Sequence, residues 1–309
     1  MTDGRGRPAA GDPVAVRVTD HVPAWTLAVA AMLAWHVGSA ISVGLFAAVG
    51  SAGTSWLRLS IGALVLLAIY RPNVRGMGRS RLGPAVVMGA TIGTMTLTFL
   101  ASAERIPFGT AVALGFMGPL TLGVLGTRSL RDLVWPVLAI FGVLALTEPW
   151  AASADVVGVA FGLANGVCWA LYIVLSAHVG GKFSGAQGLS VVLPVAAVVA
   201  GIVGIPQAAG HLTWEVLATA TVAAVLVVVV SFSLDMLALR RIATSTFGTI
   251  AALQPATGAL IGFLSLGQVP TAIGIVGTVL VVIAGIGVTR AEAARHALPS
   301  PQVQTGLMG

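Results

Sequence analysis

The sequence has few of the charged residues that cover the surface of a water-soluble protein. Only 8% of its 309 residues are Asp, Glu, Lys or Arg, against roughly 25% in soluble domains. Hydrophobic residues make up 57% of the chain, and the mean hydropathy is +0.99. We therefore expect an all-α integral membrane protein, because 39 glycines suit closely packed helices better than lipid-facing strands.

Residues that bind metals or perform hydrolysis are also scarce. The single cysteine, Cys168, excludes a disulfide within the chain and a cysteine metal site. The sequence has no H-E-x-x-H, no G-x-S-x-G and no Walker A motif. We therefore expect no metal, no cofactor and no enzyme activity. An ATP-driven pump is excluded as well, so any energy for transport must come from a gradient.

We expect ten membrane-spanning helices, because a span needs about 20 mostly apolar residues and ten spans would take up roughly 200 of the 309. A short polar tail is expected on either side of them, disordered over 1–22 and unstructured over 290–309. The expected spans are 25–48, 52–70, 84–102, 108–126, 133–148, 156–177, 187–206, 215–236, 244–265 and 271–289.

The basic residues predict how these spans are oriented. With the N-terminus in the cytoplasm, every Arg and Lys except Arg58 and Arg105 falls on the cytoplasmic side, as the positive-inside rule requires. The net charge of +6 is therefore a sign of membrane topology and not of nucleic-acid binding. We expect a multi-pass protein of the cell inner (cytoplasmic) membrane with both termini cytoplasmic, working as a monomer or homodimer in the lipid bilayer.

An internal repeat appears when residues 105–126 are aligned with 241–262 without a gap. Identical pairs include Arg105/Arg241, Ile106/Ile242, Pro119/Pro255, Thr121/Thr257 and Gly126/Gly262. Both segments lead into the fourth helix of a five-helix half, which gives halves at 23–150 and 151–289. An odd number of helices makes such halves inverted in the membrane, an arrangement of many secondary transporters. A transporter with its substrate site between the halves is the expected function.

Pro119 and Pro255 lie in the middle of matched spans. Each proline removes a backbone donor and frees the carbonyl four residues earlier, at Gly115 and Ala251. We interpret them as the breaks of two broken helices that line a substrate path. The alternative is a pair of packing kinks.

The sixth span combines a ridge of small residues with a polar and aromatic face. Gly158, Gly162 and Gly166 recur every four residues and allow a neighbouring helix to approach closely. On one face, Asn165, Trp169 and Tyr172 follow at i, i+4 and i+7. They could line a pocket for a small zwitterion, or provide interhelical hydrogen bonds and aromatic packing.

Three ionisable residues lie within apolar runs. Arg58 is expected to snorkel to the outer interface, with binding of a substrate carboxylate as the alternative. Asp235 could form a salt bridge with Arg240 or Arg241, or could carry a coupling proton. His36 could titrate near neutral pH or stay neutral and hydrogen-bonded.

The segments Gly109–Leu114, Gly118–Leu120, Cys168–Ile173, Ser233–Arg240 and Thr246–Thr249 with Pro255 resemble threonine/homoserine exporters of the EamA type, in the drug/metabolite transporter superfamily. Leu45–Phe46 and Leu57–Leu59 agree with the same family. The resemblance implies two EamA repeats, alternating access, and amino acids such as threonine or homoserine as substrates. Where the family has Glu, this chain has Gly115 and Gln254, and Val43 replaces a Lys. A less polar substrate, or coupling through Asp235 or His36, would follow from these differences.

A secondary exporter of small metabolites is therefore the expected function, with export of a drug-like compound, a passive channel or a membrane scaffold as alternatives. The proton-coupling candidates are Asp235 and His36. The predicted substrate-binding residues are Gly115, Pro119, Asn165, Trp169, Tyr172, Gln254, Pro255 and Arg58.

Overall fold

The computed structural model describes residues 23–72, 79–125, 133–151, 155–179, 185–239, 241–242 and 244–297. All regular structure in these ranges is helical. Eight helical stretches there are long and apolar enough to cross a membrane, and Phe108–Gly123 and Val134–Thr147 form two shorter apolar helices. The chain is thus an all-helical, multi-pass membrane protein, as the composition predicts.

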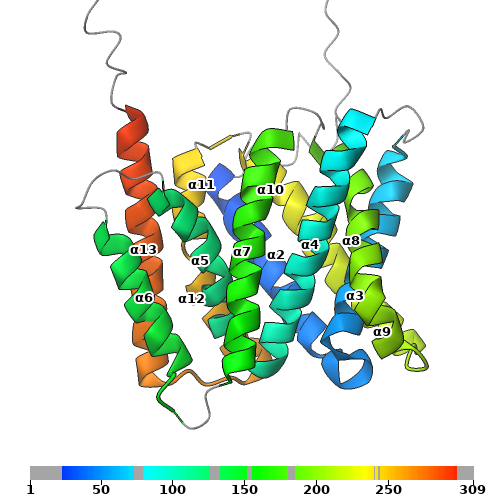
Figure 1. The fold of residues 1–309 in the computed structure, drawn as a ribbon, viewed down its shortest axis with the longest axis horizontal. Helices are drawn as coiled ribbons and strands as arrows, with labels where there is room; N and C mark the ends of the chain where they lie inside the picture. Colours follow the sequence, from blue (N-terminus) through cyan, green and yellow to red (C-terminus); the bar gives the residue numbers. More distant parts are fainter. Residues whose placement is uncertain are drawn as a thin grey trace, which may run out of the picture.

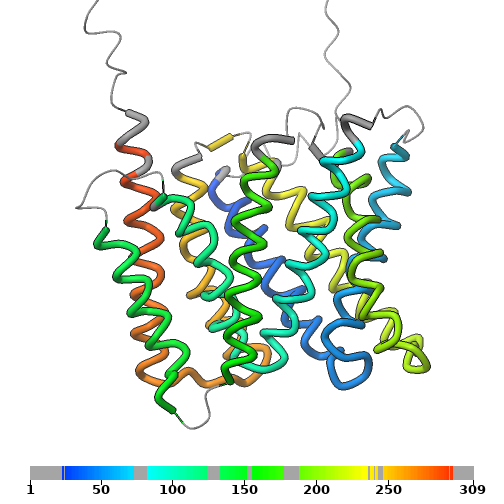
Figure 2. Tube along the Cα trace, viewed as in Figure 1, coloured from blue at the N-terminus to red at the C-terminus, as the bar shows by residue number. Residues whose placement is uncertain are grey.

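The helices stand side by side as a bundle, and α2 begins at the end of the bundle where α13 finishes (Figures 1 and 2). In the first half they are α2 (Ala24–Val43), α3 (Phe46–Tyr70), α4 (Arg79–Arg105), α5 (Phe108–Leu125) and α6 (Val134–Thr147). In the second half they are α7 (Val156–Val179), α8 (Gly185–Ala208), α9 (Trp214–Ala224), the π-helix η3 (Val225–Val230), α10 (Ser231–Leu239), α11 (Thr244–Ala251), α12 (Gln254–Leu266) and α13 (Ala272–Ala297).

The connection between the first two spans differs from the prediction. α2 ends at Val43, and α3 begins at Phe46 and kinks at Gly50, whose φ of 65° is accessible to glycine at little cost. The side chain of Gln207 occupies the space where a Cβ of Gly50 would lie. Its Oε1 accepts hydrogen bonds from the backbone N–H groups of Ala52 and Gly53, at 2.8 and 3.0 Å. Gln207 thus caps the part of α3 that follows the kink.

The C-terminal helix is longer than the sequence suggested. α13 continues to Ala297, so the expectation of an unstructured tail from residue 290 is wrong for 290–297. This segment holds alanines at 291, 293, 294 and 297, and alanine has the highest helix propensity. The remaining tail positions, 1–22 and 298–309, lie outside the described residues.

The eighth span contains a feature that was not predicted. Its central part is the π-helix η3, between α9 and α10. Short π-helical segments inside α-helices occur frequently at functional sites. The run of branched apolar residues here predicts a membrane span. It does not indicate whether the backbone hydrogen bonds follow the α-helical or the π-helical pattern.

Two groups of helices form the bundle and meet along α2 and α5. In the first group α3 packs on α8 and α4 packs on both α7 and α8; in the second, α2 packs on α9, η3, α10 and α12. α5 contacts α7 on one side and α12 on the other. The small-residue ridge of α7 is confirmed as a close approach, because a Cβ on Gly166 would lie 2.9 Å from the Leu114 carbonyl oxygen of α5.

The contact between α5 and α7 should tolerate no added side chain at Gly118. A Cβ there would collide with the backbone carbonyl of Gly166, and overpacking of this kind costs about 1–3 kcal/mol. We expect Gly118→Ala to lower the thermal unfolding midpoint of the purified protein in detergent. Gly83→Ala is the matched control, because nothing lies within 4 Å of that position and alanine favours the helix. Equal midpoints for the two variants would contradict this packing.

Candidate functional site

The two matched prolines have different effects on their helices. α5 runs without interruption through Pro119, so the predicted break of the fourth span is wrong. The ninth span is divided, because α11 ends at Ala251 and Pro255 lies in the first turn of α12. A proline in the first turn of a helix sacrifices no hydrogen bond, which suits a new helix start. Inside α5, only the backbone hydrogen bond that residue 119 would donate is missing, and the neighbouring turns keep the helix continuous.

Gly115 of α5 faces Asn165 and Trp169 of α7. Asn165 Nδ2 occupies the space where a Cβ of Gly115 would lie, and Trp169 Cε3 is 3.8 Å from that position. The Trp169 ring also meets Phe116 edge to face, with centroids 6.3 Å apart. Asn165 is only 4% exposed, and its amide has no hydrogen bond with the residues that the structure describes. An amide without a protein partner is available to a ligand.

Tyr172 does not complete this wall, although it is one turn from Trp169. It packs against a cluster of side chains from α3, α4 and α8, whereas Trp169 packs in the cluster of α5, α6 and α13. The predicted pocket face of α7 is therefore split between two neighbouring clusters.

Arg240, one predicted partner of Asp235, lies outside the described residues.

Arg58 points into the bundle. The residue is only 4% exposed, and its Nη1 lies 3.4 Å from Ser39 Oγ of α2. The expectation that Arg58 snorkels to the interface is therefore wrong, because its side chain extends toward α2 and not toward the lipid. Within the described part of the chain no carboxylate forms an ion pair with it. A buried charge without a partner costs several kcal/mol, so this position favours an anionic ligand.

His36 is fully buried on the same face of α2 as Ser39. Its Nδ1 lies 2.8 Å from the Met32 carbonyl oxygen, and its Nε2 has no hydrogen-bond partner among the described residues. The ring lies beside the backbone of Gln254, the first residue of α12. Its centroid is 6.2 Å from that of Phe108 on α5.

We call His36, Ser39, Arg58, Gln254 and Pro255 the central cluster. It joins α2 to α3 on one side and to the start of α12 on the other. Ser39 was missed by the sequence reasoning. A signal for it existed, because His36, Ser39 and Ser42 are spaced three residues apart in an otherwise apolar helix, and all three are fully buried.

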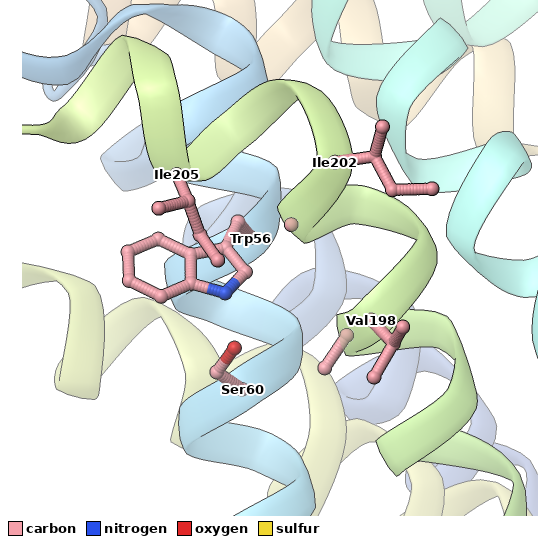
Figure 3. A pocket seen from close by; sticks show the side chains of 7 residues that line it. Trp56, Ser60, Val198, Ile202 and Ile205 are labelled. Carbon is pink, nitrogen blue, oxygen red and sulfur yellow. The ribbon is translucent and has the colours of Figure 1, made fainter.

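Two cavities lie away from this cluster. The larger, of about 390 Å³, is an apolar groove between α3 and α8 (Figure 3). Val198 and Ile202 on its wall are exposed on the outside of the bundle, so the groove faces lipid. The smaller cavity has a volume of about 210 Å³. It lies between the connection from α4 to α5 and the connection from α6 to α7, and its lining includes Arg105, Glu148 and Asp155. No group of three or more potential metal ligands comes together within the described ranges.

Comparisons with known proteins agree with this architecture. The profile of the EamA-like transporter family matches residues 156–290. The threonine/homoserine exporter RhtA of Salmonella typhimurium (strain LT2) is 33% identical over 282 residues, which cover 88% of this chain and 94% of the relative. RhtA of Escherichia coli (strain K12) is 33% identical over 87% of this chain and 92% of its own length.

A solved crystal structure shares the fold, with a TM-score of 0.58 and 17% identity over 90% of this chain and 99% of the other. The similarity to the RhtA exporters extends over most of both sequences. The chain therefore belongs to the EamA-like transporter family.

Proposed function

We propose that the protein is a secondary active exporter of small amino acids of the threonine/homoserine type, working by alternating access. The observation that carries this proposal is the 33% identity to the threonine/homoserine exporter RhtA over 88% of the chain. The architecture is consistent with it, because polar residues are buried along α2 while the outside of the bundle is apolar. A transporter, and not an enzyme, is the function we infer.

We also propose ten spans arranged as two inverted EamA repeats, 23–150 and 151–289, with α5 and α6 as spans. The packing supports this pairing. The contact between α4 and α7 corresponds to the contact of α9 and α10 with α2. In the same way, the contact between α5 and α7 corresponds to the contact between α12 and α2. The family profile, which matches 156–290, covers the second proposed repeat. These correspondences are expected if helices five apart in order are equivalent.

We place the protein in the inner membrane of the cell. The distribution of charge supports an orientation with both termini in the cytoplasm. The described arginines Arg71, Arg241 and Arg290 lie at the bundle end where α2 begins and α13 finishes (Figure 1). We call it the basic end and place it in the cytoplasm. The opposite end holds Glu148 and Asp155, and we call it the acidic end.

We propose that the substrate carboxylate binds Arg58 in the central cluster, between the two groups of helices. The guanidinium is buried, and Ser39 alone is too weak a partner at 3.4 Å. The unpaired amide of Asn165 beside Gly115 and Trp169 is a second polar contact for the substrate. Pro119, Tyr172, Gln254 and Pro255 complete the proposed lining.

Asp235 is the better candidate for proton coupling. It is partly exposed on α10, near the basic end, so it can exchange protons with the cytoplasm. His36 is fully enclosed among Trp35, Phe108 and the backbone of Gln254. A proton could reach the histidine only after a conformational change, which makes it the alternative.

The function is tested by efflux of labelled threonine and homoserine from loaded cells that lack their own exporters. We expect faster efflux than in cells with an empty vector, and we expect it to slow when the proton gradient is collapsed. Absence of efflux, with the protein shown to be in the membrane, would contradict the proposed substrate. Less polar metabolites and drugs would then be the compounds to test.

Arg58→Met should reduce threonine efflux at least tenfold, because it removes the proposed partner of the carboxylate while keeping an unbranched side chain. A tenfold loss corresponds to about 1.4 kcal/mol of binding. Replacing a buried unpaired charge by an apolar residue should not destabilise the fold, so the unfolding midpoint should stay equal or rise. Ser60→Ala, in the lipid-facing groove of the same helix, is the control. Normal efflux by Arg58→Met would exclude Arg58 from the site.

Asp235→Asn should make efflux independent of the proton gradient, because an amide cannot carry the coupling proton. The measurement is efflux of labelled threonine with the gradient intact and collapsed. Glu215→Gln, an exposed acid at the acidic end, should keep the dependence. If Asp235→Asn keeps it as well, the proposal for Asp235 is wrong and His36→Gln is the variant to examine.

A further inference from the structure

The smaller cavity opens at the acidic end, between α5, α6, α7 and the start of α13. Its volume of about 210 Å³ is below the roughly 300–1,000 Å³ of pockets for drug-sized ligands. The wall combines apolar side chains with both signs of charge. It is lined by Arg105, Ile106, Pro107, Thr110, Leu146, Thr147, Glu148, Ala151, Asp155, Val159 and Thr271. We call this cavity the acidic-end pocket.

An ion pair fixes the cation of the acidic-end pocket. Arg105 Nε donates to both carboxylate oxygens of Asp155, at 3.1 and 3.2 Å. Asp155 Oδ1 also accepts the backbone N–H of Gly158 at 2.7 Å. This hydrogen bond, followed by the contact with Arg105, lowers the pKa of Asp155 below its usual value. The ionised Asp155 therefore orients the guanidinium through Nε and leaves its two Nη groups for an anionic ligand.

A carboxylate lies on the other side of the pocket. Glu148 caps the C-terminus of α6 with a φ of 38°, in the left-handed region where glycine is usual. Its Oε1 accepts the hydroxyl of Thr271 at 2.7 Å, and the Thr271 oxygen accepts the N–H of Gly274 at the start of α13. One carboxylate oxygen of Glu148 remains for a cationic ligand.

Thr110 contributes a neutral polar group to the acidic-end pocket. It lies in the first turn of α5, lines the pocket, and is only 6% exposed. Its hydroxyl forms no hydrogen bond with any residue in the described ranges. A hydroxyl that lines the pocket and has no protein partner is available to a polar group of a ligand.

We propose that the acidic-end pocket is a second binding site, for a small α-amino acid in its zwitterionic form. Arg105 would bind the carboxylate, Glu148 the ammonium group, and Thr110 a polar atom of the side chain. This inference rests on the proposed function, and it places a separate binding site on the extracellular side. An amino acid leaving the central cluster would occupy this site before it enters the medium.

The test is equilibrium binding of labelled threonine to the purified protein in detergent. We expect Glu148→Gln and Thr110→Val to weaken one class of threonine sites at least tenfold. Glu215→Gln, an acid at the same end on α9 and outside the pocket, should bind like the unmodified protein. Equal binding by all four proteins, or binding by none, would overturn the proposal.

This experiment separates the two proposals. If threonine is exported but its binding does not depend on Glu148, the proposed export function stands and the proposed second site is wrong. If threonine binding depends on Glu148 but threonine is not exported, the proposed second site stands and the proposed export function is wrong.

Discussion

The buried guanidinium of Arg58 is the constraint on which the proposed transport path depends. A cation inside a membrane bundle loses its hydration, and the 3.4 Å contact with Ser39 replaces little of it. The charge is therefore stabilised only when an anion joins it. In the proposed site, a substrate carboxylate would supply that anion and, at the same time, would tie α3 to α2. Binding and the packing of the two groups of helices are then linked, as alternating access requires.

The rest of the central cluster follows from the position of α2. This helix packs on the second half of the chain through α9, α10 and α12, so a ligand that joins α2 to Arg58 also joins the two helix groups. The start of α12 lies beside His36, and the break before Pro255 places the polar backbone of a new helix end inside the bundle. At the acidic end, Arg105 of the proposed second site would offer a substrate carboxylate a guanidinium, as Arg58 would in the central cluster.

Much of the fold was predictable, because a bilayer leaves a clear signal in the sequence. The apolar runs correspond to the observed helices, and the ridge of Gly158, Gly162 and Gly166 predicted a close helix contact. The kink at Gly50 was not predictable, because it depends on Gln207, a residue far away in the sequence. Pro119 and Pro255 look equivalent in the aligned halves, yet only the second coincides with a helix start. Periodicity also could not reveal whether Arg58 extends toward lipid or toward Ser39, because that depends on which face α3 presents to α2.

Recognition of the carboxylate by Arg58 is tested most directly by competition in a counterflow assay. Proteoliposomes with the purified protein would be loaded with unlabelled threonine and then exposed to labelled threonine. Unlabelled homoserine or threoninol, the alcohol that lacks the carboxylate of threonine, would be added outside. We expect transient uptake of label that homoserine suppresses and threoninol does not. Equal suppression by threoninol would contradict a site built around the buried charge of Arg58.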